Sequence, residues 1–168
     1  LDEQRPISEV YLTWDETNWK RGFMPIEQST PPEVKDLLNA YPDAIYLDVR
    51  TEDEFAAGHP KRAINIPVAF PGPGGQMALN ADFQGVVEAF LPKDAKIVCG
   101  CQVGMRSQAA AEILEKAGYQ DLTNMRGGFG GLQDPGTGEV IPGWQDEGYD
   151  VESGATQENS YEAQKGRA

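Results

Sequence analysis

The segment from Cys101 to Ser107 holds the side chains that are best suited to nucleophilic chemistry. It reads Cys-Gln-Val-Gly-Met-Arg-Ser and lies between an apolar run ending at Cys99 and a segment with helical periodicity. A cysteine placed between a strand and a helix N-terminus lies near backbone N–H groups and the partial positive charge of the helix. Arg106 adds a full positive charge. Because all three favour a thiolate over a thiol, we predict that Cys101 is a catalytic nucleophile.

The rest of this loop is predicted to bind an anionic substrate. Gly104 permits the tight backbone that would let successive amides surround the Cys101 sulfur. Arg106 is expected to face the anion, with capping of the loop as its alternative role. The predicted substrate-binding residues share this one loop and are Arg106, Gln102, Val103, Gly104 and Met105.

The second cysteine and the single histidine are predicted to be structural. Cys99 ends a buried strand, where cysteine acts as a small apolar side chain, and the alternative is a resolving thiol. A disulfide between Cys99 and Cys101 would close a strained ring, and two cysteines with His59 are too few for a structural zinc site. His59 is expected to make a structural hydrogen bond. We expect no metal and no organic cofactor.

The elements around the loop alternate between strands and helices. Thr30-Pro31-Pro32-Glu33 and Thr51-Glu52-Asp53-Glu54 are capping boxes, and Gly58 ends the second, short helix. A Pro/Gly loop is predicted over 67–80. The remaining expected elements are strands over 44–47, 63–66, 95–99 and 121–124, and helices over 83–90 and from the loop to Gly118. This alternation predicts an α/β fold with a doubly wound parallel sheet, whose ligands bind at the carboxyl ends of the strands.

Several segments, in order, resemble the rhodanese superfamily from Ile26 to Val151. They are Asp48-Val49-Arg50 with Glu54-Phe55 and Gly58-His59, Ala63-Ile64-Asn65-Ile66-Pro67, Cys101 to Arg106, Gly127-Gly128-Phe129, Gly143-Trp144, and Gly148 to Glu152. The resemblance implies a rhodanese-like sheet of about five strands flanked by helices. It also implies sulfur transfer from thiosulfate or a similar donor to cyanide or a thiol, through a persulfide on Cys101.

Details of these segments carry further expectations. Asp48, Arg50 and Glu54 are expected to form a polar staple, and the glycines at 127–131 to allow close backbone approach near the site. Arg62 stands where the family usually has glycine. Residues 131–142 look like an insertion that lines the mouth of the site.

Two other functions use similar parts. A cysteine phosphatase or arsenate reductase also places a cysteine and an arginine in one loop, but the phosphatase loop is one residue longer than the four residues between Cys101 and Arg106. The shorter loop offers one amide fewer, and a tetrahedral phosphoryl group would crowd it. The third possibility is a noncatalytic binding module built on the rhodanese scaffold.

The length and the net charge of the chain limit its domain organisation and its partners. The 168 residues fit one domain, expected at 26–152, between an irregular N-terminal extension (1–25) and a flexible C-terminal tail (153–168). The net charge of −13 argues against nucleic-acid and membrane partners, which need basic surfaces, and no apolar run approaches the ~20 residues that span a bilayer. We expect a small anionic sulfur donor and a small thiol or cyanide acceptor, or a thiol-bearing protein. The expected location is cytoplasmic; because the chain starts at Leu1 rather than Met, a removed signal peptide is the alternative.

Overall fold

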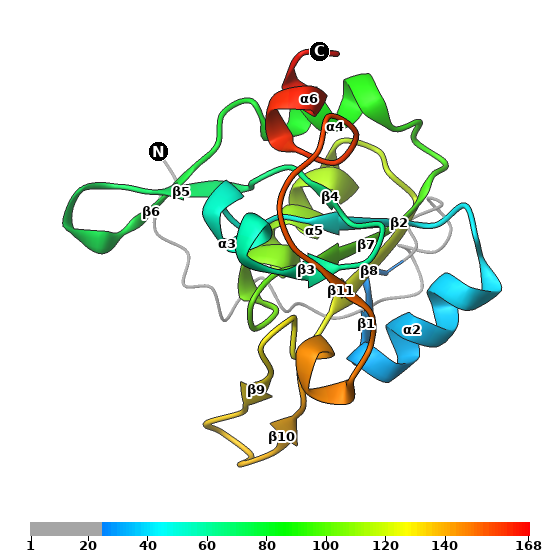
Figure 1. Ribbon diagram of the computed structural model, residues 1–168, viewed down its shortest axis with the longest axis vertical. Coiled ribbons are helices and arrows are strands. Elements are labelled where there is room, and N and C mark those ends of the chain that lie inside the picture. Colours follow the sequence, from blue (N-terminus) through cyan, green and yellow to red (C-terminus); the bar gives the residue numbers. More distant parts are fainter. Residues whose placement is uncertain (1–24) are drawn as a thin grey trace.

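A five-stranded parallel sheet forms the centre of the molecule (Figure 1). The structure, a computed structural model, describes residues 25–168. The strands are β1 (Glu27–Ser29), β2 (Ile45–Asp48), β4 (Ile64–Asn65), β7 (Lys96–Gly100) and β8 (Asp121–Met125). Their order is β1-β8-β7-β2-β4, and every neighbouring pair is parallel. The predicted parallel α/β sheet is confirmed.

The described part of the chain has five helices, two of which begin at the predicted capping boxes. The five helices are α2 (Pro31–Ala40), α3 (Glu52–Ala57), α4 (Phe83–Phe90), α5 (Met105–Lys116) and α6 (Tyr161–Lys165), with short 3-10 turns η2 (Pro73–Gly75) and η3 (Trp144–Glu147). Both capping boxes form: the Thr30 amide donates to Glu33, and the Thr51 amide to Glu54. Within residues 25–168 no helix has the length and apolar character to cross a membrane.

Each face of the sheet carries its own hydrophobic core. Successive strand residues point to opposite faces, so Leu47 and Cys99 join the core under α4 and α5, whereas Tyr46 and Val98 join the core under α2 and α3. The sheet is therefore covered by helices on both sides, which is the doubly wound arrangement (Figure 1). This layering leaves the carboxyl ends of the strands as the place where loops meet.

Three short antiparallel pairs lie outside the main sheet. They are β3 (His59–Pro60) with β11 (Val151–Glu152), β5 (Ala69–Pro71) with β6 (Met77–Leu79), and β9 (Leu132–Gln133) with β10 (Val140–Ile141). The segment 67–80, predicted as a loop, thus contains a hairpin with Gly74 and Gly75 at positive φ. Both this hairpin and the β9–β10 hairpin project from the body of the molecule (Figure 1).

The ends of the described chain differ from the prediction. Residues 27–29, which show no strand pattern in the sequence, form β1 at the edge of the sheet because β8 offers them a parallel partner. The expected flexible tail over 153–168 is wrong, because α6 packs on the body: the Tyr161 ring joins the core beside α4, and its hydroxyl accepts a hydrogen bond from Asn80. The predicted N-terminal extension, apart from Pro25, lies outside the described residues.

Candidate functional site

Cys101 lies between the carboxyl end of β7 and the N-terminus of α5, as predicted. Its side chain is almost completely buried, and its Sγ accepts a hydrogen bond from the Gly104 amide at 3.1 Å. Gly104 has a φ of +110°, which a residue with a side chain rarely adopts. The hydroxyl of Ser107 lies 3.3 Å from the same sulfur. The sulfur thus contacts one amide of its own loop and one hydroxyl from the first turn of α5.

A turn that follows β8 is hydrogen-bonded to the backbone of the cysteine loop. The amides of Phe129, Gly130 and Gly127 donate to the carbonyls of Cys101, Gln102 and Val103, at 2.8, 2.9 and 3.2 Å. In a trans peptide the next N–H points away from the carbonyl. Three outward carbonyls therefore turn the amides of the next three residues inward, and the third of these is the Gly104 amide that reaches the sulfur.

Glycine is required where this turn touches the loop. Gly128 has a φ of +62°, and a Cβ there would lie 2.6 Å from the carbonyl oxygens of both Cys101 and Gln102. Backbone atoms of a packed loop cannot yield to such an overlap. The expected close approach of backbones at residues 127–131 is confirmed, and its purpose is to orient the cysteine loop.

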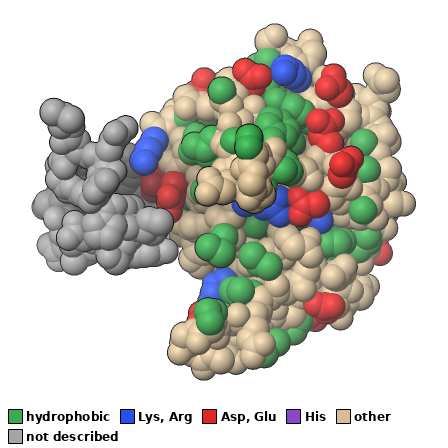
Figure 2. Space-filling view, turned by 90° about the vertical axis from the view of Figure 1, so that its left-hand side faces the viewer, with side chains coloured by type: hydrophobic (Ala, Val, Ile, Leu, Met, Phe, Trp, Pro, Cys, Tyr) green, Lys and Arg blue, Asp and Glu red, His purple; other side chains and the backbone are tan. Residues whose placement is uncertain are grey.

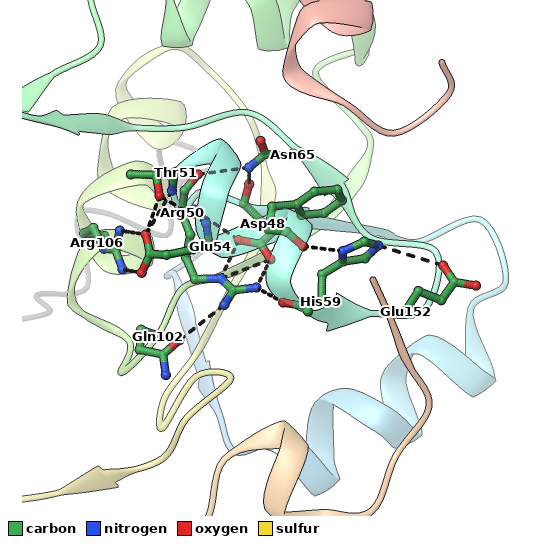
Figure 3. A network of polar contacts seen from close by, with 11 residues as sticks. Asp48, Arg50, Thr51, Glu54, His59, Asn65, Gln102, Arg106 and Glu152 are labelled. Carbon is green, nitrogen blue, oxygen red and sulfur yellow. Dashed lines mark hydrogen bonds and ion pairs between the residues drawn. The ribbon is translucent and has the colours of Figure 1, made fainter. Parts of the chain in front are cut away.

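Arg106 is paired with a carboxylate instead of facing open space. Its guanidinium donates two hydrogen bonds to Glu54, at 2.7 and 2.8 Å (Figure 3). The bonds from Arg106, together with those from the amide and hydroxyl of Thr51, lower the pKa of Glu54 to about 2. In the structure α3 thus supplies a counter-charge to Arg106 through Glu54, and binding of an anion by Arg106 stays a prediction.

Asp48 and Arg50 form the predicted polar staple. The Arg50 guanidinium binds both oxygens of Asp48, at 2.7 to 3.2 Å, and also donates to the Gly58 carbonyl at 2.6 Å (Figure 3). A further bond, 3.3 Å long, reaches Oε1 of Gln102 in the cysteine loop. The ring of Phe129 lies 4.6 Å from the guanidinium, so the staple contacts both turns.

His59 and Cys99 have the structural surroundings that were predicted. Nδ1 of His59 lies 2.7 Å from the Phe55 carbonyl, to which it donates a hydrogen bond, and its ring stacks on that of Phe55. Cys99 is fully buried in the core, and burial followed by the nearby Cys101 raises its pKa to about 12. A thiol of that kind stays protonated at neutral pH and is a poor resolving nucleophile.

A shallow pocket of about 490 Å³ opens beside the loop. Its lining residues are Arg50, Glu54, Ala57, Gly58, Gln102, Phe129, Gln145 and Val151. All of them lie outside 131–142, so the expectation that this insertion lines the mouth is not met; the β9–β10 hairpin instead anchors Ile141 against the turn at Gly127. Figure 2, which looks onto the side that is at the left of Figure 1, shows basic and acidic side chains next to each other near the centre, between groups of hydrophobic side chains.

Two residues that touch this site were not predicted as site residues. Ser107 ends the segment that begins at Cys101 but has no predicted role, and Asn124 lies in β8, where it accepts a hydrogen bond from the Ser107 hydroxyl at 2.6 Å. Both are buried. No local signal in the sequence points to Asn124, because β8 also contains Asp121 and Thr123.

Comparisons with known proteins agree with this geometry. Residues 30–134 match the family model for the rhodanese-like domain. The chain is 33% identical over 129 residues to Protein HIGH ARSENIC CONTENT 1, mitochondrial, of Arabidopsis thaliana, covering 71% of this chain and 75% of that one. It is 37% identical over 100 residues to the thiosulfate:glutathione sulfurtransferase of Homo sapiens, covering 58% and 85%.

Solved structures share the fold. Rv0390 from M. tuberculosis superposes with a TM-score of 0.63 at 26% identity, covering 78% of this chain and all of that one. Two further plant relatives are matched over less than half of their own length.

Proposed function

This chain belongs to the family of rhodanese-like domains, and we propose that it is a sulfurtransferase that carries sulfane sulfur as a persulfide on Cys101. The observation that carries the proposal is the orientation of the cysteine loop. Its carbonyls are bonded outward to the turn after β8, which turns its amides inward, and the Gly104 amide donates to the Cys101 sulfur. Such a ring of donors stabilises an anionic sulfur, whether thiolate or persulfide.

The proposed reaction is a double displacement. The Cys101 thiolate attacks the outer sulfur of thiosulfate; a bond forms between Sγ and that sulfur, the S–S bond of thiosulfate breaks, and sulfite leaves with the bonding electrons. An acceptor, cyanide or a thiolate, then attacks the outer sulfur of the persulfide. The Sγ–S bond breaks and its electrons return to Cys101, so the thiolate is restored. No oxidant, metal or organic cofactor enters this balance.

The donor and acceptor follow from the charges beside the loop. The pairs Arg106–Glu54 and Arg50–Asp48 leave the entrance close to neutral although the whole chain carries −13. A small anionic donor is therefore bound by the inward amides of Gln102, Val103 and Gly104 more than by a free cation. Thiosulfate fits this description, and we propose a low-molecular-weight thiol, cyanide or a thiol-bearing protein as acceptor.

Intact mass spectrometry tests the proposal directly. After incubation with thiosulfate and removal of excess donor, the natural chain should gain the mass of one sulfur, and cyanide should remove it. Cys101→Ser should gain nothing and lose at least ~99% of turnover while unfolding at a similar temperature. Cys99→Val is the matched control, because it replaces the neighbouring buried thiol by a side chain of similar volume and should keep most of the activity. Sulfur uptake by Cys101→Ser would show that Cys101 is not the residue that carries the persulfide.

A phosphatase or arsenate reductase remains the rival to be tested in the same assays. One relative is named for arsenic content, and its name states no reaction. The four residues between Cys101 and Arg106 leave a ring too small for a whole phosphoryl group, so aryl phosphate hydrolysis should be negligible. Cys101-dependent turnover of an aryl phosphate or of arsenate, without sulfur uptake, would favour the rival. A stable protein complex with no turnover of any donor would favour a noncatalytic binding module.

A further inference from the structure

Asn124 is connected to the sulfur of Cys101 by two routes. Its Oδ1 accepts the hydrogen bond of the Ser107 hydroxyl at 2.6 Å, and that hydroxyl oxygen lies 3.3 Å from Sγ. Its Nδ2 donates to the Gly104 carbonyl at 3.2 Å, and the Gly104 amide donates to Sγ. Asn124 is only 3% exposed, so its polar atoms depend on these partners.

The direction of every hydrogen bond around Asn124 is fixed by groups that can only accept. The Gly104 carbonyl is one such acceptor, so the atom of Asn124 that faces it must be Nδ2. A chain of three hydrogen bonds fixes the same orientation from the other side. The Glu112 carboxylate can only accept, so Gln108 donates to it and turns its amide oxygen toward Gln28. Gln28 donates to that oxygen and turns its own amide oxygen toward Asn124, which donates to it at 2.9 Å. Both sides demand the same orientation of the Asn124 amide, with Oδ1 toward Ser107.

The Ser107 hydroxyl therefore donates its single proton to Oδ1 of Asn124. With that proton donated to Oδ1, the hydroxyl offers only lone pairs to Cys101. Lone pairs suit a thiol, which can donate its S–H, but they repel an anionic sulfur. To stabilise a thiolate or persulfide the hydroxyl must turn toward Sγ, and Oδ1 of Asn124 then loses a buried hydrogen bond.

We propose that Asn124 is a positioning residue that competes with the Cys101 sulfur for the Ser107 hydroxyl and so limits how strongly an anionic sulfur is held. Ser107 is the residue that touches the reacting atom, and Asn124 sets the cost of turning its hydroxyl. In the context of the proposed sulfur transfer, Sγ is the sulfur that departs as a thiolate when the acceptor removes the outer sulfur. The competition therefore limits how strongly the Ser107 hydroxyl can stabilise that departing thiolate.

The test measures the rate at which neutral iodoacetamide alkylates Cys101 in the full chain at pH 7, with the labelled cysteine identified by peptide mapping. Ser107→Ala removes the donor and should slow alkylation about tenfold, which corresponds to ~1.4 kcal/mol. Asn124→Ala and Asn124→Leu remove the competing acceptor and should accelerate alkylation about threefold or more, because the freed hydroxyl donates to the thiolate. In the Ser107→Ala background, either change at Asn124 should alter the rate by less than about twofold.

The gain in rate separates this proposal from a merely structural role. If Asn124 only supported the loop, replacing it would slow the alkylation of Cys101. The slowing would be the same in the natural chain and in the Ser107→Ala background, and that result would overturn the proposal. Asn80→Ala is the matched control, since it deletes another buried asparagine, which bonds Pro67 and Tyr161 instead of the cysteine loop. It should lower the unfolding temperature without changing alkylation.

Failure of the proposed function gives a different pattern. Alkylation of Cys101 requires no sulfur transfer. The variants can therefore show the expected alkylation rates even if thiosulfate never forms a persulfide on Cys101. In that case only the sulfurtransferase assignment fails. If the persulfide forms but Asn124→Leu and Asn124→Ala both alkylate no faster than the natural chain, only the competition is wrong. When both ideas hold, these variants should also release sulfur to cyanide about threefold faster, because the freed hydroxyl donates to Sγ as it departs as a thiolate.

Discussion

Among single residues, the pairing of Arg106 with Glu54 changes how the charge of the loop must be understood. A basic residue inside an anion-binding loop suggests direct contact with the donor. In the structure its two hydrogen bonds go to a carboxylate that Thr51 also holds, and the same bonds lower the pKa of Glu54 to about 2. Arg106 therefore neutralises a carboxylate at the entrance, and its removal would expose a negative charge to an anionic donor.

A double substitution distinguishes neutralisation from direct binding. Arg106→Ala should raise the KM for thiosulfate about tenfold, since Glu54 then stands unpaired near the loop. Adding Glu54→Gln, which keeps the shape of the capping box, should restore the KM to within about threefold of the natural value. Steady-state kinetics with thiosulfate and cyanide measure both. A KM that stays at the level of Arg106→Ala in the double variant would mean that Arg106 binds the donor directly.

At the scale of elements, the site depends on two turns that follow neighbouring strands. The loop after β7 carries the cysteine, and the turn after β8 fixes its carbonyls. Because parallel neighbours end at the same edge of the sheet, these turns are brought together by the strand order alone. The loop is thus held by backbone amides of a turn that contributes no nucleophile.

Gly128→Ala tests this dependence. The new Cβ would overlap the carbonyls of Cys101 and Gln102, so the loop must move, and we expect turnover to fall at least tenfold. Gly118→Ala is the matched control: its φ of +97° imposes a comparable backbone strain, but its Cβ would enter open space at the far end of α5. It should lose about 1 kcal/mol of stability and keep its activity. Equal activity in both variants would show that the turn does not position the loop.

At the scale of the whole molecule, the charge of −13 opposes the approach of an anionic donor. The local ion pairs leave the entrance nearly neutral, so the long-range field is the main electrostatic barrier. Salt screens that field over about 8–10 Å at physiological strength.

Raising the ionic strength should therefore speed the loading of the persulfide. Between ~10 and ~150 mM sodium chloride, kcat/KM for thiosulfate should rise about two- to fivefold, whereas the alkylation of Cys101 by neutral iodoacetamide should stay constant. Stopped-flow loading and alkylation rates on the same preparation provide the comparison. If loading slows with salt, a net positive potential guides the donor and the role given to the overall charge is wrong.

The sequence by itself determined the parallel α/β fold and the place of Cys101. Capping boxes at Thr30 and Thr51, the apolar run ending at Cys99 and the glycine at 104 are local signals, and local signals survive folding because they act within one turn of the chain. The core position of Cys99 follows from the same kind of local signal. The glycines at 127–131 predicted a close backbone approach because glycine has no side chain, but they did not show which segment would approach.

Only the tertiary structure decided which groups meet. Glu54 and Arg106 are 52 positions apart, and Ser107 and Asn124 are 17 apart, so no spacing rule connects them. β1 became a strand because β8 lay beside it, and the C-terminal segment became ordered because Tyr161 found a place in the core. Hydrogen bonds and packing between distant segments depend on strand order and on the shapes of opposing surfaces, and these are fixed when the chain folds as a whole.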